Sequence, residues 1–153
     1  MNITNTIWRN CNAYPDRIAI LYDGHPVSYR TLRVGVEQAS ARLAATGVTR
    51  GDVVALSIQH KLSYLFVLLA VVRLGAVALP LNRDKKELVE ADRIHTIVLD
   101  KDDGWRSRTL PALHYLEARM LLASPVDGER FDAPPVAQGL DEGPWLVAGA
   151  SGT

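Results

Sequence analysis

The sequence contains a single cysteine, Cys11, among its 153 residues. A lone cysteine excludes an internal disulfide and favours a reducing compartment, so the sequence predicts a cytoplasmic protein. A role for Cys11 as a nucleophile would need a nearby base and a lowered pKa, and no histidine is close to it in the sequence. We therefore expect Cys11 to be a structural, half-buried residue of the first helix.

The sequence also has no net charge, because 17 basic residues balance 17 acidic ones. This balance provides no electrostatic footprint for nucleic acid or for an anionic membrane, and no nucleic-acid partner is expected. The four histidines are scattered singly, and no metal-ligand spacing appears, so no metal site is predicted. The acidic run at residues 100–103 follows a predicted strand, which is typical of a solvated loop.

Long apolar runs are rare as well. The most apolar stretch, residues 62–81, is long enough for a membrane span to be considered. Arg73 and Gly75 interrupt it and Pro80 ends it, which favours a helix, a glycine stop and a short buried strand. The first twelve residues lack the charged start and apolar run of a signal peptide. An integral membrane protein is therefore not predicted.

The first third of the chain predicts a helix, a β-hairpin and a second helix. Residues 4–13 are expected to form the first helix, and strands at 18–22 and 27–29 are joined by a tight turn at Asp23–Gly24. Apolar residues then recur at intervals of three and four as far as Ala45. Such a one-sided stripe is typical of an amphipathic helix.

Strands and helices alternate in the middle of the chain. Strands are predicted at residues 53–58, 77–79 and 96–99, with helices at residues 62–74 and 82–93 between them. This order indicates an α/β fold with a mainly parallel, Rossmann-like sheet and flanking helices. Past Leu99 the pattern weakens. It predicts a loop at 100–109, a helical turn at 110–115, a strand at 118–123, an irregular connection at 124–144 and a last strand at 145–148.

Four short segments together resemble a known family. They are YPDRIA at 14–19, VSYRTL at 27–32, AATGVTRGDVVAL at 44–56 and LAVVRLGAVALPLN at 69–82. In order and spacing they resemble the start of the adenylate-forming, AMP-binding enzymes, which include acyl-CoA synthetases, aryl-CoA ligases and peptide-synthetase adenylation domains. The resemblance implies the first part of that family's large N-terminal domain, with an N-terminal β-hairpin before the sheet.

The last nine residues, WLVAGASGT, are similar to the strand and first half of the family's phosphate-binding loop. Gly149 and Ala150 depart from the aromatic-and-hydroxyl pair that usually precedes the serine. The resemblance implies that Ser151, Gly152 and Thr153 contact the β- and γ-phosphates of ATP. Hydroxyls and backbone N–H groups bind phosphate oxygens, and glycine allows the backbone to approach them. It also implies that residues 1–153 are a partial AMP-binding domain ending within this loop.

The resemblance implies an ATP-dependent, AMP-forming carboxylate ligase. Such an enzyme adenylates a carboxylic acid, of the fatty or aryl kind, with ATP and Mg²⁺, and passes the acyl group to coenzyme A or a carrier-protein thiol. The family's adenine pocket, magnesium-binding glutamate, acyl pocket and catalytic lysine all follow the phosphate loop. We therefore expect no catalytic residue in this chain and no activity from it alone.

Two other readings remain. The chain could be a non-catalytic scaffold that keeps the family's N-terminal architecture and acts as a binding module. It could also associate with itself through apolar surface on the helix at residues 62–74 and the strand at 145–148, as a homo-oligomer. A plain Rossmann-type dinucleotide domain is disfavoured, because no Gly-x-Gly-x-x-Gly follows the first strand. His60 and Lys61 follow a strand end, where ligands gather, but a structural use is favoured.

Overall fold

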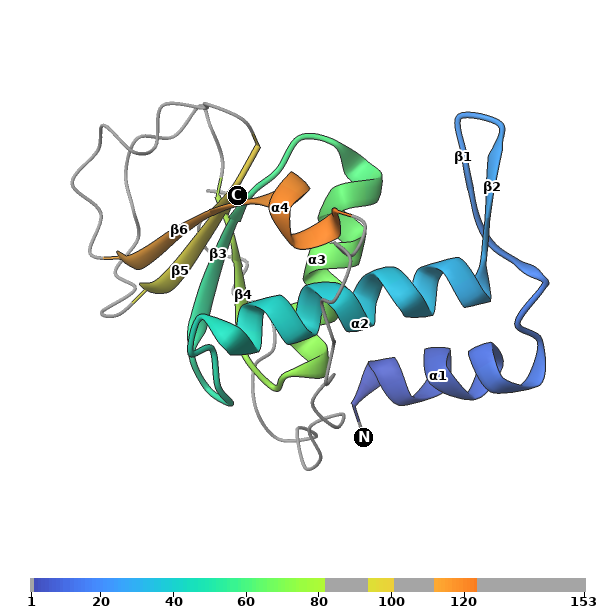
Figure 1. Cartoon of the computed structure of the whole chain (residues 1–153), viewed down its shortest axis with the longest axis horizontal. Coiled ribbons are helices and arrows are strands. Elements are labelled where there is room, and N and C mark those ends of the chain that lie inside the picture. Colours follow the sequence, from blue (N-terminus) through green and yellow to red (C-terminus); the bar gives the residue numbers. More distant parts are fainter. Residues whose placement is uncertain (1, 82–93, 101–111, 124–153) are drawn as a thin grey trace.

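The computed structural model describes residues 2–81, 94–100 and 112–123. Within these residues a two-stranded hairpin precedes a four-stranded parallel sheet, and helices pack beside the sheet (Figure 1). The strands are β1 (Ile18–Tyr22), β2 (His25–Ser28), β3 (Val53–Ser57), β4 (Val77–Pro80), β5 (Ile94–Leu99) and β6 (Ala112–Glu117). The helices are α1 (Ile3–Ala13), α2 (Tyr29–Ala45), α3 (Lys61–Arg73) and α4 (Ala118–Leu122).

The turn between β1 and β2 is made by two residues with left-handed backbone conformation. Asp23 has a φ of 48° and Gly24 a φ of 76°. Two consecutive positive φ angles match the twist of a two-residue hairpin, which is why Asp-Gly predicts this turn. The hairpin leads directly into α2, where the Ser28 hydroxyl accepts a hydrogen bond of 3.1 Å from the Thr31 N–H. This contact caps the first turn of the helix.

The four-stranded sheet has the order β4-β3-β5-β6, and every adjacent pair is parallel. Strand β3 is therefore internal, and its residues Val54, Ala55 and Leu56 are at most 1% exposed. Successive side chains of a strand point to opposite faces. Accordingly Val54 and Leu56 belong to one buried cluster and Ala55 to a second one. The run of consecutive apolar residues in β3 is the expected pattern for a strand covered on both faces.

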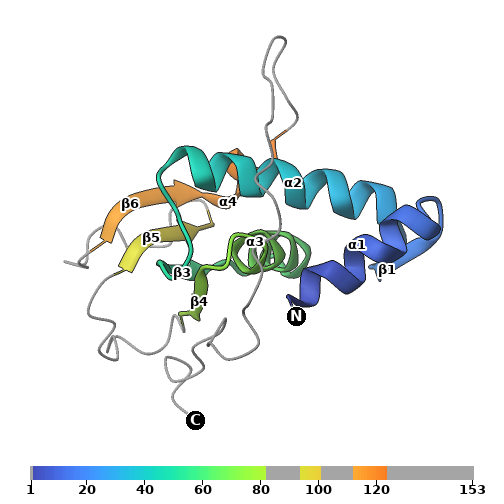
Figure 2. The same ribbon diagram turned by 90° about the horizontal axis from the view of Figure 1, so that it is seen from below.

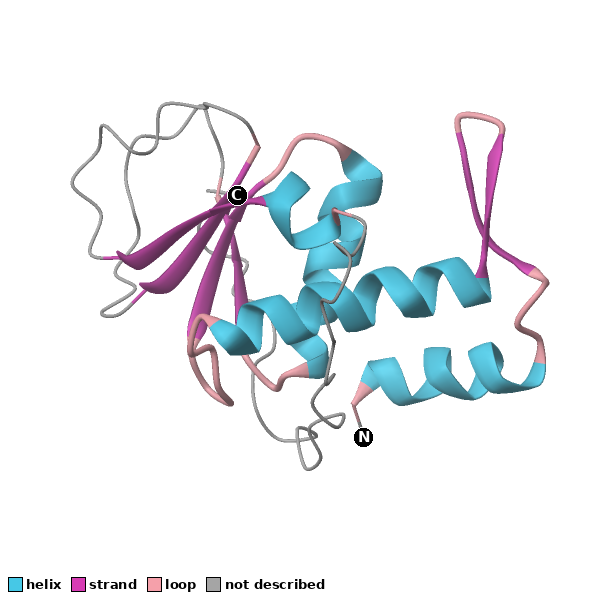
Figure 3. Ribbon diagram, viewed as in Figure 1, coloured by secondary structure: helices cyan, strands magenta, loops and turns pink. Residues whose placement is uncertain are grey.

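Helices α2, α3 and α4 pack together beside the sheet, and α1 and the hairpin lie at the end of α2 remote from it (Figures 1 and 2). Figure 3 shows the separation of the layers, with the four strands fanned on one side and the helices on the other. The larger apolar cluster lies between them. It joins Leu43 of α2 and Val67 of α3, both fully buried, to Val98 of β5.

Helices α2 and α3 approach closely at a glycine. A Cβ atom added to Gly35 would lie 2.2 Å from Cε1 of Phe66, which is inside van der Waals contact. Gly35 thus allows the Phe66 ring to lie directly against the backbone of α2. A glycine in the middle of a helix costs about 1 kcal/mol relative to alanine. The close contact with Phe66 is the steric reason for a glycine at this position.

Polar and aromatic contacts fasten α1 to the end of α3. The Asn2 side-chain amide donates to the Val72 carbonyl at 2.8 Å, while its oxygen accepts from the Thr4 N–H and so caps α1. The Arg73 guanidinium lies 4.8 Å from the centre of the Trp8 ring. Burial lowers the pKa of Arg73, and the nearby Glu37 carboxylate partly offsets that effect. These contacts fix the N-terminus against the helix layer.

Most predicted elements up to Leu99 are confirmed, with boundaries that shift by one or two residues. The apolar stretch at 62–81 forms α3, a stop at Gly75 with a φ of 74°, and β4, as expected. None of the helices in the described ranges combines the length and apolarity needed to cross a bilayer. The helix predicted at 82–93, the irregular connection at 124–144 and the strand predicted at 145–148 lie outside the described residues.

Two predictions near the end of the described part are wrong. Residues 112–115 of the helical turn expected at 110–115 belong to strand β6, and residues 118–122 of the strand expected at 118–123 form helix α4. Strand β6 exists because it pairs in parallel with β5, and local propensity does not reveal a partner so distant in sequence. The α4 sequence Ala-Arg-Met-Leu-Leu consists of strong helix formers, a signal that its apolar character obscured.

The close approach at Gly35 can be tested by a double-mutant cycle. Gly35→Ala should lower the free energy of unfolding by about 1–2 kcal/mol, because overpacking against Phe66 outweighs the gain in helix propensity. In a Phe66→Leu background, which removes the clashing ring, the same substitution should cost less. Urea unfolding followed by circular dichroism measures all four proteins. An equal effect of Gly35→Ala in both backgrounds would show that the ring contact is not the cause.

Candidate functional site

The carboxyl ends of the parallel strands form one edge of the sheet. From β3 the chain passes through α3 to β4 on one side, whereas β5 and β6 lie on the other side of β3. Strand connections therefore diverge between β3 and β5. In open α/β sheets the crevice outside the carboxyl ends at such a switch point is where ligands bind. The carboxyl ends of β3 and β5 are thus the candidate site that the topology defines.

Asp100 bridges the two strand ends at this switch point. Its carboxylate accepts a hydrogen bond from the Gln59 N–H, and its own N–H donates to the Ser57 carbonyl at 3.1 Å. The two contacts hold the β3–α3 turn to the end of β5. Asp100 is therefore an ordered part of the edge, whereas the sequence predicted a solvated acidic run. The other residues of that run, 101–103, lie outside the described ranges.

His60 has the structural use that the sequence favoured. It is the N-cap residue of α3, and its Nδ1 accepts from the Ser63 N–H at 3.2 Å. Its ring also packs edge-on against Tyr22, with 5.3 Å between the ring centres. Lys61 begins α3. His60 therefore fixes the start of the helix that leaves the candidate site.

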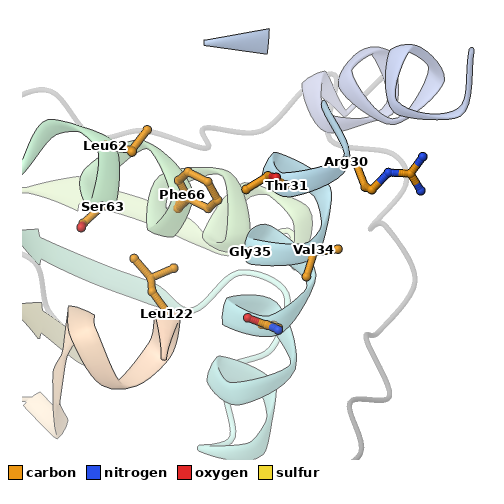
Figure 4. A pocket seen from close by; sticks show the side chains of 9 residues that line it. Arg30, Thr31, Val34, Gly35, Leu62, Ser63, Phe66 and Leu122 are labelled. Atoms are coloured by element: carbon orange, nitrogen blue, oxygen red, sulfur yellow. The ribbon is translucent and has the colours of Figure 1, made fainter. Parts of the chain in front are cut away.

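A pocket of about 440 Å³ lies in the helix layer, between α2, α3 and α4 (Figure 4). Val34, Leu62, Phe66 and Leu122 give it a largely apolar lining. Arg30 stands at its rim with the guanidinium directed away from it, and pairs with Asp16 at 3.0 Å (Figure 4). The pocket therefore offers an apolar contact surface. None of the residues labelled in Figure 4 directs a charged group into it. Sequence reasoning missed this hollow, because it depends on how three helices pack.

Cys11 is a structural residue of α1, as expected, but it is buried, at 4% exposed, where the sequence predicted a half-buried position. Its Sγ donates a hydrogen bond of 3.3 Å to the Tyr29 carbonyl. Burial raises the pKa of the thiol, and the positive charge of Arg33 opposes that shift in part. A raised pKa disfavours the thiolate, so Cys11 lacks the activation that a nucleophile requires.

The residues predicted to bind ATP, Ser151, Gly152 and Thr153, lie outside the described ranges, so their contact with phosphate stays a prediction. Among the residues that the structure does describe, no group of three or more histidine, cysteine, aspartate or glutamate side chains is arranged to hold a metal ion.

Comparison with known proteins identifies the family. The family model described as AMP-binding enzyme matches residues 7–102, more than half of the chain. The 4-chlorobenzoate–CoA ligase of an Arthrobacter species is 30% identical over 150 residues, which covers 91% of this chain. Surfactin synthase subunit 3 of Bacillus subtilis is 35% identical over 89 residues, or 58% of this chain. The protein belongs to the AMP-binding, adenylate-forming enzyme family.

A solved structure agrees with this fold. The N-terminal subdomain of NpsA from Klebsiella oxytoca superposes with a TM-score of 0.75 at 23% sequence identity, over 99% of this chain and 40% of that one. The chain spans only 28% of the length of the Arthrobacter ligase and 7% of the surfactin synthase subunit. The described architecture is therefore that of the first part of the N-terminal domain of adenylate-forming enzymes.

The role of Asp100 at the sheet edge predicts a graded loss of stability. Asp100→Ala removes the acceptor of the Gln59 N–H and should lower the free energy of unfolding by about 1 kcal/mol. Asp100→Asn keeps a side-chain oxygen that accepts this hydrogen bond, so it should cost less. Urea denaturation of both variants provides the measurement. Equal losses would show that the charge of Asp100, and not its acceptor, supports the turn.

The burial of Cys11 predicts slow reaction with thiol reagents. At pH 8 the folded protein should react with a disulfide reagent at least about 10-fold more slowly than the urea-unfolded protein, because the folded state disfavours the thiolate and covers it. Because folding raises the pKa of Cys11, burial of the neutral thiol is fully compatible with the folded state at neutral pH. Stability is lost as the pH rises into the alkaline range, where the unfolded chain ionises its thiol first. Cys11 is the only cysteine, so the absorbance change reports on it alone. Equal rates in the two states would contradict its burial.

Proposed function

We propose that this chain is the N-terminal part of an ATP-dependent, AMP-forming carboxylate ligase. Membership of the AMP-binding family is the observation that carries the proposal. The switch point between β3 and β5 supports it, since this is where an α/β sheet of this order receives a ligand. The short Ser-Gly-Thr run at 151–153 has the composition of a phosphate-binding loop.

The proposed reaction has two steps. A carboxylate oxygen of the acid attacks the α-phosphorus of ATP, the bond to the bridging oxygen breaks, and pyrophosphate leaves as the acyl-adenylate forms. A thiol then attacks the acyl carbon, loses its proton and displaces AMP. The enzyme contributes to such chemistry by positioning the reactants and stabilising charge.

Within this chain, Ser151, Gly152 and Thr153 are the residues proposed to contact the β- and γ-phosphates. The two hydroxyls and the backbone N–H groups would donate to phosphate oxygens, and the glycine would let the backbone approach them. Asp100 and His60 have a different task. They hold the β3–α3 turn in place at the edge of the sheet. We assign them this positioning role and no contact with the substrate.

The remaining requirements are proposed for the whole protein. Mg²⁺ would accompany ATP and offset the charge of its phosphates, with ligands from parts of the family's domain that follow the phosphate loop. Coenzyme A is the favoured thiol acceptor, because a CoA ligase matches 91% of this chain. A carrier-protein thiol is the alternative acceptor. The free thiol of Cys11 fits a reducing compartment such as the cytoplasm.

The proposal predicts that hydroxyl removal in the phosphate loop weakens adenylation. In the enzyme translated from the complete reading frame, Ser151→Ala and Thr153→Ala should each lower kcat/KM for ATP by about 10- to 100-fold, since each removes a donor to the phosphates. Pyrophosphate release at varied ATP and fixed acid gives the value. Asp16→Ala, which removes an exposed carboxylate in the loop between α1 and β1, is the control and should leave the activity unchanged.

The 153-residue chain by itself should release no pyrophosphate above background, because the proposal places the rest of the site outside it. Acid-dependent pyrophosphate release by this chain alone would contradict that division of the site. A reading frame that stops after Thr153, with no ligase activity in the native protein, would support the non-catalytic scaffold instead.

A further inference from the structure

A bulge in β5 brings two histidines together at the amino end of the sheet. Val53 of β3 pairs with Ile94 and Val54 pairs with Thr96, so His95 is the extra residue between them. A bulge of this kind turns its side chain out of the regular alternation. On the other side of β5, Thr96 pairs with His114 of β6. The rings of His95 and His114 lie with 5.3 Å between their centres.

This separation is compatible with two imidazoles that share one metal ion. With a Zn–N bond of about 2.1 Å and a ring nitrogen about 1.1 Å from the ring centre, each centre would lie about 3.2 Å from the ion. Two such rings at the tetrahedral angle of about 109° have centres about 5.2 Å apart. The two rings are also tilted by 40° with respect to one another, so they do not form a parallel stack.

One of the two imidazoles already has the supporting contact typical of a metal ligand. Nδ1 of His95 lies 2.7 Å from the Thr96 hydroxyl oxygen. When Nδ1 carries the proton and donates it to this hydroxyl, Nε2 has the lone pair that binds a metal. Metal-binding histidines almost always hydrogen-bond through their other ring nitrogen, which fixes the tautomer and the ring orientation.

Nε2 of His95 lies near the C-terminal end of α2, where the helix dipole favours a cation. Gly47 follows the C-terminal end of α2, and a Cβ atom added there would lie 3.6 Å from this nitrogen. The C-terminal end of a helix carries the negative end of its dipole, which favours a nearby cation. His95 is half-buried and His114 is exposed, so an ion can reach both rings from solvent.

We propose that His95 and His114 form a binding site for a divalent transition-metal ion such as Zn²⁺. Two imidazole nitrogens and water molecules complete its coordination, a ligand set that suits zinc, copper and nickel. The site lies at the amino ends of β5 and β6, opposite the edge proposed for ATP, and so is independent of the proposed ligase function. An ion bound there links β5 to β6 and stabilises the folded chain by mass action.

The test uses the 153-residue chain and Zn²⁺ alone. Isothermal titration should give one equivalent of bound Zn²⁺, and imidazole ¹⁵N signals should move for His95 and His114 and not for His25 or His60. His114→Ala and His95→Ala should each weaken the affinity by at least about 10-fold, as loss of one of two ligands must. Thr96→Val, which removes only the supporting hydroxyl, should weaken it by about 10-fold.

Matched controls separate this site from general histidine binding. His25→Ala removes an exposed histidine on the hairpin and should leave the affinity unchanged. His114→Ala is the decisive variant, because its side chain is exposed and its removal leaves the core intact; circular dichroism without Zn²⁺ checks its fold. The proposal is overturned if the parent chain binds no Zn²⁺ at millimolar concentration. It is also overturned if His114→Ala binds as tightly as the parent or the shifts appear at His25 and His60.

Discussion

Burial of strand β3 on both faces is the constraint on which the rest of the structure depends. A strand whose consecutive residues Val54, Ala55 and Leu56 are all buried needs a partner strand on each side and a cover on each face. Parallel partners need crossover connections, and α3 supplies the one from β3 to β4. Because all four strands run in the same direction, their carboxyl ends meet at one edge. The candidate site is therefore a consequence of how β3 is buried.

The apolar pattern predicts much of this fold from the sequence. The five apolar residues of β1 and the Asp23–Gly24 turn indicate the hairpin, and the run after Gly51 indicates β3, because the side chains and turn residues themselves carry those signals. Strand β6 could not be predicted in the same way. Its only backbone partner among the described strands is β5, and the pairing is non-local. The helix-forming residues of α4 were available as a signal, but a short apolar run does not distinguish a strand from a helix.

The candidate site residues likewise include some that a contiguous motif predicts and others that only the fold brings together. The resemblance names Ser151, Gly152 and Thr153 from a contiguous run, and that prediction awaits its test. Asp100 and Gln59 are distant in sequence and meet only because β5 lies beside β3. His95 and His114 lie close together because β5 pairs with β6 and the register of β5 against β3 shifts at His95. The spacing of these residues in the sequence predicts neither contact, because each contact depends on the order and register of the strands. The topology thus adds residues that no motif contains.

The most direct test of the central claim is acid-dependent exchange of labelled pyrophosphate into ATP by the protein translated from the complete reading frame. The exchange reports the reversible first step alone, so it does not depend on which thiol accepts the acyl group. The account predicts exchange that requires both a carboxylic acid and Mg²⁺, measured across a panel of fatty and aromatic acids. AMP formation without any dependence on an acid, or no exchange with any acid by a folded protein, would contradict the assignment of this chain to a carboxylate ligase.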